Sequence, residues 1–171
     1  TEGDTRIVGH RHTYGWANAQ KVFFVIEFSK PFTAFEPIDE YNFYYRVHFD
    51  TVAGEQIGVK VAISTVSVDG ARQNLEAELT GVEFDAARKS AYDKWNKEIS
   101  KIRIEGATAE QEEIFYTGMY HMYVAPSLLS DVDGKYRGAD NEVYDNPGFD
   151  TYTTFSLWDT YRAKLPLMTI T

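Results

Sequence analysis

Residues 56–79 read QIGVKVAISTVSVDGARQNLEAEL, and the spacing of their apolar side chains changes in the middle of the stretch. Up to residue 67 apolar positions alternate with small or polar ones, which predicts a β-strand. One face of that strand carries Ile57, Val59, Val61, Ile63 and Thr65. From Gly70 to Leu79 the pattern predicts a short helix, with Asp69 as its N-cap residue. The stretch therefore separates a β-rich part of the chain from a helical part.

The part before this boundary contains two further segments rich in β-branched and aromatic residues. They are residues 22–28, VFFVIEF, and residues 41–49, YNFYYRVHF. Glycine and proline residues at positions 37, 54 and 58 punctuate these segments. Several short strands with such punctuation favour an antiparallel β-sandwich over βαβ units.

The part after the boundary shows helical periodicity. Residues 85–102 carry apolar positions three and four apart, which predicts one amphipathic helix that serves as a linker. Thr108 and Gln111 have the spacing of a capping box and predict a second helix, which ends near Pro126. Because that helix is apolar almost all round, we expect neighbouring elements to bury it. Residues 127–153 look irregular, and Ser156 is placed to begin a further helix.

Composition excludes several classes of function. The balance of 43% hydrophobic and 25% charged residues in 171 is that of a globular protein. A formal net charge of −9 argues against nucleic acid and anionic lipid as partners, because both need clusters of lysine and arginine. With no cysteine, disulfides, thiol catalysis and zinc–thiolate sites are excluded. No apolar run approaches the roughly 18 residues of a membrane span.

Several motifs, in order along the chain, resemble glycoside hydrolase family 92. In the helical part they are residues 130–133 (SDVD), 134–140 (GKYRGAD) and 153–162 (TTFSLWDTYR). In the β-rich part they include residues 15–17 (GWA) and 67–75 (SVDGARQNL). The combination of SLWDT with SDVDG is specific, whereas either motif alone would be weak. The resemblance extends over nearly all of the sequence.

The resemblance implies the end of a β-sandwich in residues 1–83, a linker helix in 84–106 and the first helices of an (α/α)6 catalytic barrel in 107–171. It also implies a calcium-dependent bacterial α-mannosidase that removes terminal α-mannose from a mannose-containing glycan with inversion. The parent enzyme is expected to be periplasmic or secreted. We expect its acid, base and calcium ligands to lie after Thr171, so that this chain contains no catalytic residue and no metal ligand and has no activity alone. The remainder of the parent enzyme is then a partner of this segment.

Trp158 and Asp159 are the candidate substrate-binding residues. An indole can cover the apolar side of a mannose ring, and a carboxylate can accept hydrogen bonds from two sugar hydroxyls. The resemblance places both in the subsite for the terminal mannose. Alternatively, Asp159 is the acidic half of a capping box that begins at Ser156.

The acidic loop offers other candidates. Residues 131–134, DVDG, do not match a calcium-binding EF-hand loop, because the glycine falls at position 4 and a lysine at position 5. A turn is therefore favoured over a calcium site. Arg137 and Asp140 either pair within the loop or reach the cleft.

The four histidines and Trp16 are weaker candidates, and His10 and His12 are interpreted as surface or domain-interface residues. His10 and His12 would share a face of a strand, but two histidines without a third ligand are poor evidence for zinc. His121 is interpreted as a hydrogen-bonded core residue, and His48 ends a strand. Trp16 either projects toward the catalytic domain or packs in the core.

Two other classes of function compete with the enzyme hypothesis. One is a non-catalytic carbohydrate-binding β-sandwich with a helical appendage, and the other is a scaffold without ligand contact. The apolar helix of residues 114–124 disfavours the binding module, since a free-standing module has no use for a helix that must be buried. The scaffold requires Trp158 to point into a core.

Overall fold

The structure is a computed structural model that describes residues 1–15, 19–39 and 44–171. The chain forms two compact units, each of which is described by itself. The first contains Thr1–Gly81 and Ser130–Phe149, and the second contains Val82–Leu129 and Asp150–Thr171. Trp16 and the first residues of the segment 41–49 lie outside the described residues.

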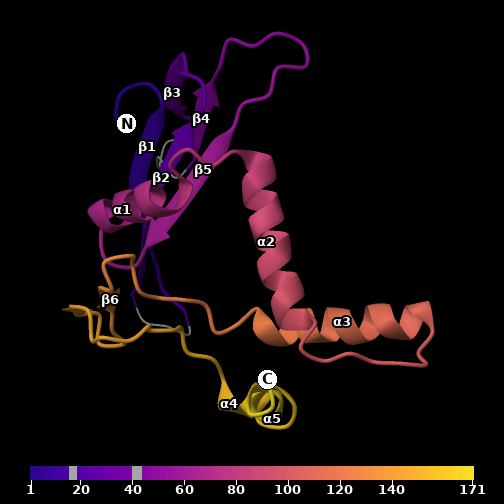
Figure 1. Cartoon of the computed structure of the whole chain (residues 1–171). Coiled ribbons are helices and arrows are strands. Elements are labelled where there is room, and N and C mark those ends of the chain that lie inside the picture. Colours follow the sequence, from indigo (N-terminus) through magenta and orange to yellow (C-terminus); the bar gives the residue numbers. More distant parts are fainter. Residues whose placement is uncertain (16–18, 40–43) are drawn as a thin grey trace. The chain divides into compact units, whose positions relative to one another are not determined.

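A three-stranded antiparallel sheet organises the first unit (Figure 1). Its strands are β1 (Arg6–Thr13), β2 (Gln20–Phe28) and β5 (Val59–Ser64), in the order β1-β2-β5. The strand predicted at residues 22–28 is confirmed as β2. The strand predicted at residues 56–67 is confirmed in its central part, and it begins only after Gly58.

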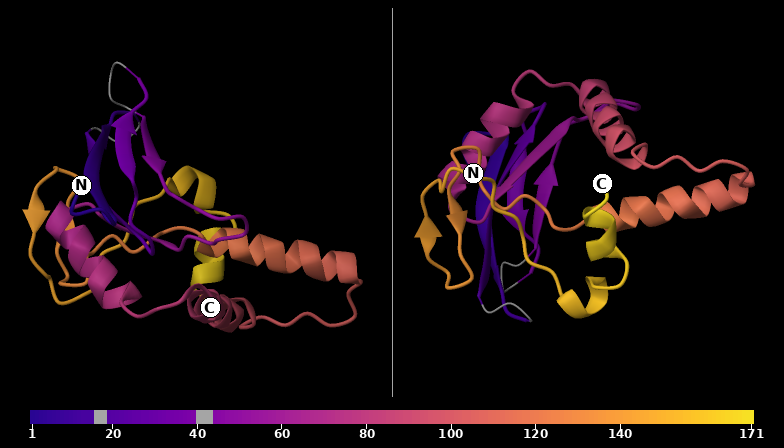
Figure 2. Two further views of the ribbon diagram at one scale, coloured as in Figure 1. Left: turned by 90° about the horizontal axis from the view of Figure 1, so that it is seen from above. Right: turned by 60° about the horizontal axis from the view of Figure 1, so that its bottom comes forward.

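Helix α1 (Val68–Leu79) lies across one face of this sheet, as Figures 1 and 2 show. The core of the unit forms between the helix and the two adjacent strands, and it consists of Val25, Ala62, Ala71 and Leu75. The N-cap of α1 is Ser67, whose hydroxyl accepts a hydrogen bond from the amide of Gly70, and not Asp69. Because Ser67 and Asp69 are both good caps, the local sequence does not choose between them.

The opposite face of β5 is apolar and exposed. Val59, Val61 and Ile63 are 54%, 52% and 61% exposed. Their neighbours Ala62 and Ser64 are the buried ones, because the small residues allow α1 to approach the strand closely. Alternation along the strand is thus confirmed, but the covered face is the one with the smaller side chains.

A second pair of strands, β3 (Ala34–Pro37) and β4 (Tyr45–His48), forms an antiparallel hairpin. The rings of Phe35 and Tyr45 stack across it with centroids 4.8 Å apart. In the segment Ser130–Phe149, expected to be irregular, β6 (Tyr136–Arg137) and β7 (Val143–Tyr144) form a third short hairpin.

The second unit is helical, with α2 (Phe84–Ile99), α3 (Ala109–Tyr123), α4 (Leu157–Thr160) and α5 (Lys164–Met168). The capping box of α3 is confirmed: the Gln111 amide donates to Thr108 Oγ1 at 3.3 Å, and the Thr108 amide donates to Gln111 Oε1 at 2.9 Å. Helix α2 ends three residues before the predicted end, at its C-cap Ser100. Among the described residues, the structure has no helix with the length and apolarity that a membrane span requires.

The expectation that neighbours bury α3 on all sides is wrong for this chain. Met119 is its one buried residue, whereas Ile114 is 65% exposed. Helix α2 contacts one side of α3, where the Trp95 and Tyr120 rings lie 4.6 Å apart. One neighbouring helix can cover only one stripe of an apolar helix.

Candidate functional site

The short helix α4 presents two chemically complementary side chains to solvent. Trp158 is 83% exposed, and its ring centroid lies 6.4 Å from that of Tyr161. Asp159, the next residue, is exposed, and its carboxylate has no partner within the described residues. An apolar ring face and an unpaired carboxylate therefore occur side by side in sequence on one turn of helix.

Asp159 does not form a capping box with Ser156, because the hydrogen bonds of such a box are missing. Ser156 is the N-cap of α4, but it makes no side-chain cap hydrogen bond. A capping box requires that bond together with a reciprocal one from the acidic residue. The carboxylate of Asp159 thus remains free to accept hydrogen bonds from a ligand, as a sugar-binding aspartate must.

Contacts within the second unit fix the segment that precedes α4. Residues on the two sides of the loop pair as an isolated β-bridge between Leu128 and Tyr152. Lys164 is buried, and its ammonium group lies 4.7 Å from the centroid of the Phe155 ring and donates to the carbonyl of Ala125. The buried lysine is a residue that sequence reasoning missed, because nothing near it in the sequence signals these partners.

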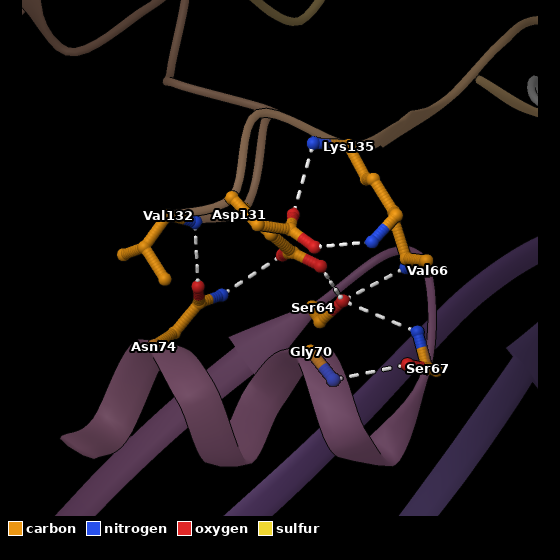
Figure 3. A network of polar contacts seen from close by, with 9 residues as sticks. Ser64, Val66, Ser67, Gly70, Asn74, Asp131, Val132 and Lys135 are labelled. Carbon is orange, nitrogen blue, oxygen red and sulfur yellow. Dashed lines mark hydrogen bonds and ion pairs between the residues drawn. The ribbon is translucent and has the colours of Figure 1, made fainter. Parts of the chain in front are cut away.

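The motifs at residues 67–75 and 130–133 meet in a buried network of the first unit (Figure 3). Asp131 is its centre and is 6% exposed. Its Oδ2 accepts a hydrogen bond from Ser64 Oγ at 2.6 Å, and its Oδ1 accepts one from Asn74 Nδ2 at 2.8 Å. Asn74 Oδ1 in turn accepts from the amide of Val132 at 2.8 Å. Gly70 packs directly against this contact, since a Cβ there would lie 2.3 Å from Asp131 Oδ2.

The geometry around Asp131 is that of an anchored turn. The amide of Gly134 donates to the Asp131 carbonyl at 2.8 Å, which closes a four-residue turn as predicted. Asp133 pairs with Lys135 at 2.6 Å, and this hydrogen bond lowers the pKa of the Asp133 carboxyl. No cluster of three or more metal-ligating side chains occurs in the described ranges. The motif therefore joins the loop to α1 and β5.

Arg137 and Asp140 do not pair with each other, which excludes the first of the two alternatives that the sequence left open. Arg137 donates to the carbonyls of Thr65 at 2.6 Å, Val66 at 3.0 Å and Asn141 at 2.6 Å. Asp140 instead accepts a hydrogen bond from the Tyr144 hydroxyl, which lowers the pKa of its carboxyl. The guanidinium group thus binds two main-chain carbonyls just after β5 and one in its own loop, and both side chains make local contacts.

The four histidines lie in three different surroundings. His10 and His12 share one face of β1 as predicted, with ring centroids 4.8 Å apart. His48 lies 3.0 Å from Glu36 across the β3–β4 hairpin. His121 is exposed and contacts the ring of Tyr120, so its assignment to the core is wrong. The error follows from the incomplete cover of α3.

Comparison with known proteins gives consistent results. The profile of the glycosyl hydrolase family 92 catalytic domain matches residues 70–171, which is more than half of the chain. A family GH92 α-mannosidase from Bacteroides thetaiotaomicron is 36% identical, with a TM-score of 0.87 over 98% of this chain. A family GH92 inverting mannosidase from the same organism is 25% identical, with a TM-score of 0.81 over 97% of this chain.

The chain spans about a quarter of the length of these solved structures, 25% in both cases. A third similar structure, the GH92 family glycosyl hydrolase ccman5, is 26% identical with a TM-score of 0.85, and 99% of this chain and 24% of that one are covered. No curated protein sequence is significantly similar to the chain.

Proposed function

Since this chain belongs to glycosyl hydrolase family 92, we propose that it is part of an exo-acting α-mannosidase and contributes the floor of the subsite for terminal mannose. Trp158 and Asp159 form that floor in the proposal. The observation that carries it is that both side chains on α4 are exposed and that the Asp159 carboxylate has no partner within the described residues. A site that awaits a sugar needs an uncovered ring face and a free hydrogen-bond acceptor.

The proposed reaction is hydrolysis of a terminal α-mannoside with inversion. Support comes from two similar solved structures, one of an α-mannosidase and one of an inverting mannosidase. Inversion needs one carboxylic acid to protonate the leaving oxygen and one carboxylate to activate water, about 6.5–9.5 Å apart. The proposal assigns both groups to parts of the enzyme outside this chain. Trp158 and Asp159 would then bind and orient the sugar ring.

We assign residues 1–83 to the end of a β-sandwich, 84–106 to a linker helix and 107–171 to the first helices of an (α/α)6 barrel. The exposed apolar face of β5 supports the sandwich, because a second sheet would bury it. The exposed side of α3 supports the barrel in the same way. Ser130–Phe149 would be a loop of the barrel region that packs on the sandwich region.

Calcium dependence and export remain part of the proposal through the family alone. Calcium takes six to eight oxygen ligands, and the described residues contain no cluster of three or more candidate side chains. The described residues therefore do not form a calcium site by themselves, and no step of the proposed role passes through the ion. A periplasmic or secreted location is proposed on the same basis.

The principal test is Asp159→Ala in the full-length protein, assayed with an aryl α-mannoside. Loss of a charge-assisted hydrogen bond costs about 1.5–3 kcal/mol, which corresponds to roughly 10–150-fold in kcat/KM. Asp85→Ala is the matched control, because Asp85 is also an exposed carboxylate in the first turn of a helix. Wild-type kcat/KM per folded molecule in Asp159→Ala would remove Asp159 from the subsite.

The same assay separates the enzyme from the carbohydrate-binding module that competes with it. Full-length protein that binds mannose but releases none from the mannoside would favour the module. The isolated 171-residue segment is expected to release no mannose, with or without calcium, because the proposal places acid and base elsewhere. Turnover by the segment alone would contradict that placement.

A further inference from the structure

A pair of imidazoles on β1 stands outside the proposed mannosidase role. His10 and His12 are exposed on the same face of the strand, because side chains two apart in a strand point the same way. Their ring centroids lie 4.8 Å apart and the ring planes are tilted by 42°. No hydrogen bond or ion pair within the described residues uses either ring, since their contacts are to each other and to Phe23.

The spacing suits two ligands of one metal ion. With a metal–nitrogen bond of about 2.0–2.1 Å, each ring centroid would lie about 3.2 Å from the metal. Two such centroids are about 4.5 Å apart for a square-planar 90° angle and about 5.2 Å apart for a tetrahedral angle. The observed 4.8 Å falls between the two values. The separation of the two rings is therefore compatible with both acting as ligands of one ion.

Phe23 on the adjacent strand holds the pair in place. It lies opposite His10 in the β1–β2 register, and its ring centroid is 6.0 Å from that of His10 and 6.5 Å from that of His12. Both imidazoles thus pack beside one aromatic ring on a paired strand, which restricts their rotamers before an ion binds. Such preorganisation reduces the entropic cost of binding.

The type and number of the ligands indicate which metal ion the site would bind. Imidazole nitrogens suit late first-row divalent ions, and the affinity of a given site rises toward Cu²⁺. No third protein ligand accompanies the pair in the ranges 1–15, 19–39 and 44–171. Tetrahedral structural zinc needs four ligands, whereas tetragonal Cu²⁺ or Ni²⁺ accepts water at its remaining positions. Lys21, opposite His12 in the register, adds a positive charge that opposes the ion.

We propose that His10 and His12 form a two-imidazole chelating site on β1 for a late first-row divalent metal ion, Cu²⁺ or Ni²⁺. The inference is independent of the mannosidase proposal, because it uses neither the sugar subsite nor a catalytic group.

The test is calorimetric titration of the full-length protein with NiCl₂ in a non-coordinating buffer. The wild-type protein is expected to bind one equivalent of nickel. His10→Gln and His12→Gln should each lower the nickel affinity by at least about tenfold, because a lost ligand should cost more than a lost outer-shell contact, which costs about 10–100-fold. His121→Gln is the matched control and should change nothing, since His121 is exposed and no second imidazole contacts it within the described residues.

Lys21→Gln gives a second test that leaves both ligands in place. Removing one positive charge at cross-strand distance from a divalent ion should tighten binding about two- to fivefold at low salt. Equal nickel binding by the wild type and by a double variant that combines His10→Gln with His12→Gln, or no binding by the wild type, would overturn the site. Unchanged or weaker binding in Lys21→Gln would place the ion elsewhere than beside His12.

Discussion

Replacing Gly70 with alanine would put a methyl group inside the contact between α1 and the anchored loop. The added Cβ would lie 2.3 Å from Asp131 Oδ2 and 2.8 Å from Ser64 Oγ, both of which are buried. Neither group belongs to a long flexible side chain that could move aside. The carboxylate must therefore leave its position, and its hydrogen bonds to Ser64 and Asn74 are broken.

The size of the effect follows from two opposing contributions. A hydrogen bond to a charged group is worth about 1.5–3 kcal/mol, so the two lost bonds cost about 3–6 kcal/mol. Alanine is favoured over glycine in a helix interior by about 0.8–1.0 kcal/mol, which is the most that it can contribute at Gly70 in the first turn. The net change is a loss of about 2–5 kcal/mol in the stability of the α1 region. Steric displacement outweighs helix propensity at this position.

Hydrogen exchange in full-length protein measures this loss locally. Amides of α1 should exchange at least about 30-fold faster in Gly70→Ala, since each 1.36 kcal/mol is tenfold. Gly118→Ala is the matched control, because Gly118 is also within a helix and a Cβ there meets nothing within 4 Å. That change should slow exchange in α3. Exchange in α1 that is unchanged or slower in Gly70→Ala would refute the packing of Asp131 against the helix.

Three further perturbations test other parts of the structure. Thr108→Ala removes one half of the capping box, so α3 should lose about 0.5–2 kcal/mol and its first-turn amides should exchange faster. The hydrogen bond from Lys135 lowers the pKa of the Asp133 carboxyl in the folded state. The pair should therefore stabilise the fold fully above the ordinary carboxyl pKa of about 3.9, and this stabilisation should be lost as the pH falls through the lower folded value. Acid unfolding of Lys135→Met should lack this contribution, and acid unfolding curves identical to those of the wild type would argue against the pair. Gly9→Ala would place a Cβ 2.7 Å from Phe24 Cζ, so the melting temperature should fall, and an unchanged melting temperature would contradict the close packing of β1 on β2.

Local patterns predicted local structure well. The capping box of α3 was readable because its two partners are three residues apart, and the shared face of His10 and His12 follows from the two-residue period of a strand. The start of α1 was misplaced at Asp69 because Ser67 is an equally good cap. Mixed α and β structure with antiparallel strands is confirmed, but its place in a sandwich and a barrel stays a prediction.

Contacts between distant residues could not be read from the sequence. Asp131 and Ser64 are 67 residues apart, and no periodicity links them. A glycine in the first turn of α1 was the one local sign that something approaches the helix closely. For the candidate subsite, the sequence alone left Asp159 as either a cap or a ligand. The structure leaves Ser156 without a cap bond, while the sugar-binding role itself stays a prediction.

The interleaving of the two units has a consequence for synthesis on the ribosome. Because the chain emerges from its N-terminus, the first sheet and α1 are complete well before Ser130–Phe149, which belongs to the same unit, has been translated. Until then the Ser64 hydroxyl and the Asn74 side-chain amide lack the Asp131 carboxylate as a hydrogen-bond acceptor. The first unit therefore cannot finish folding before α2 and α3 have been made. A ribosome that stalls within α3 leaves the first unit without the loop that carries Asp131.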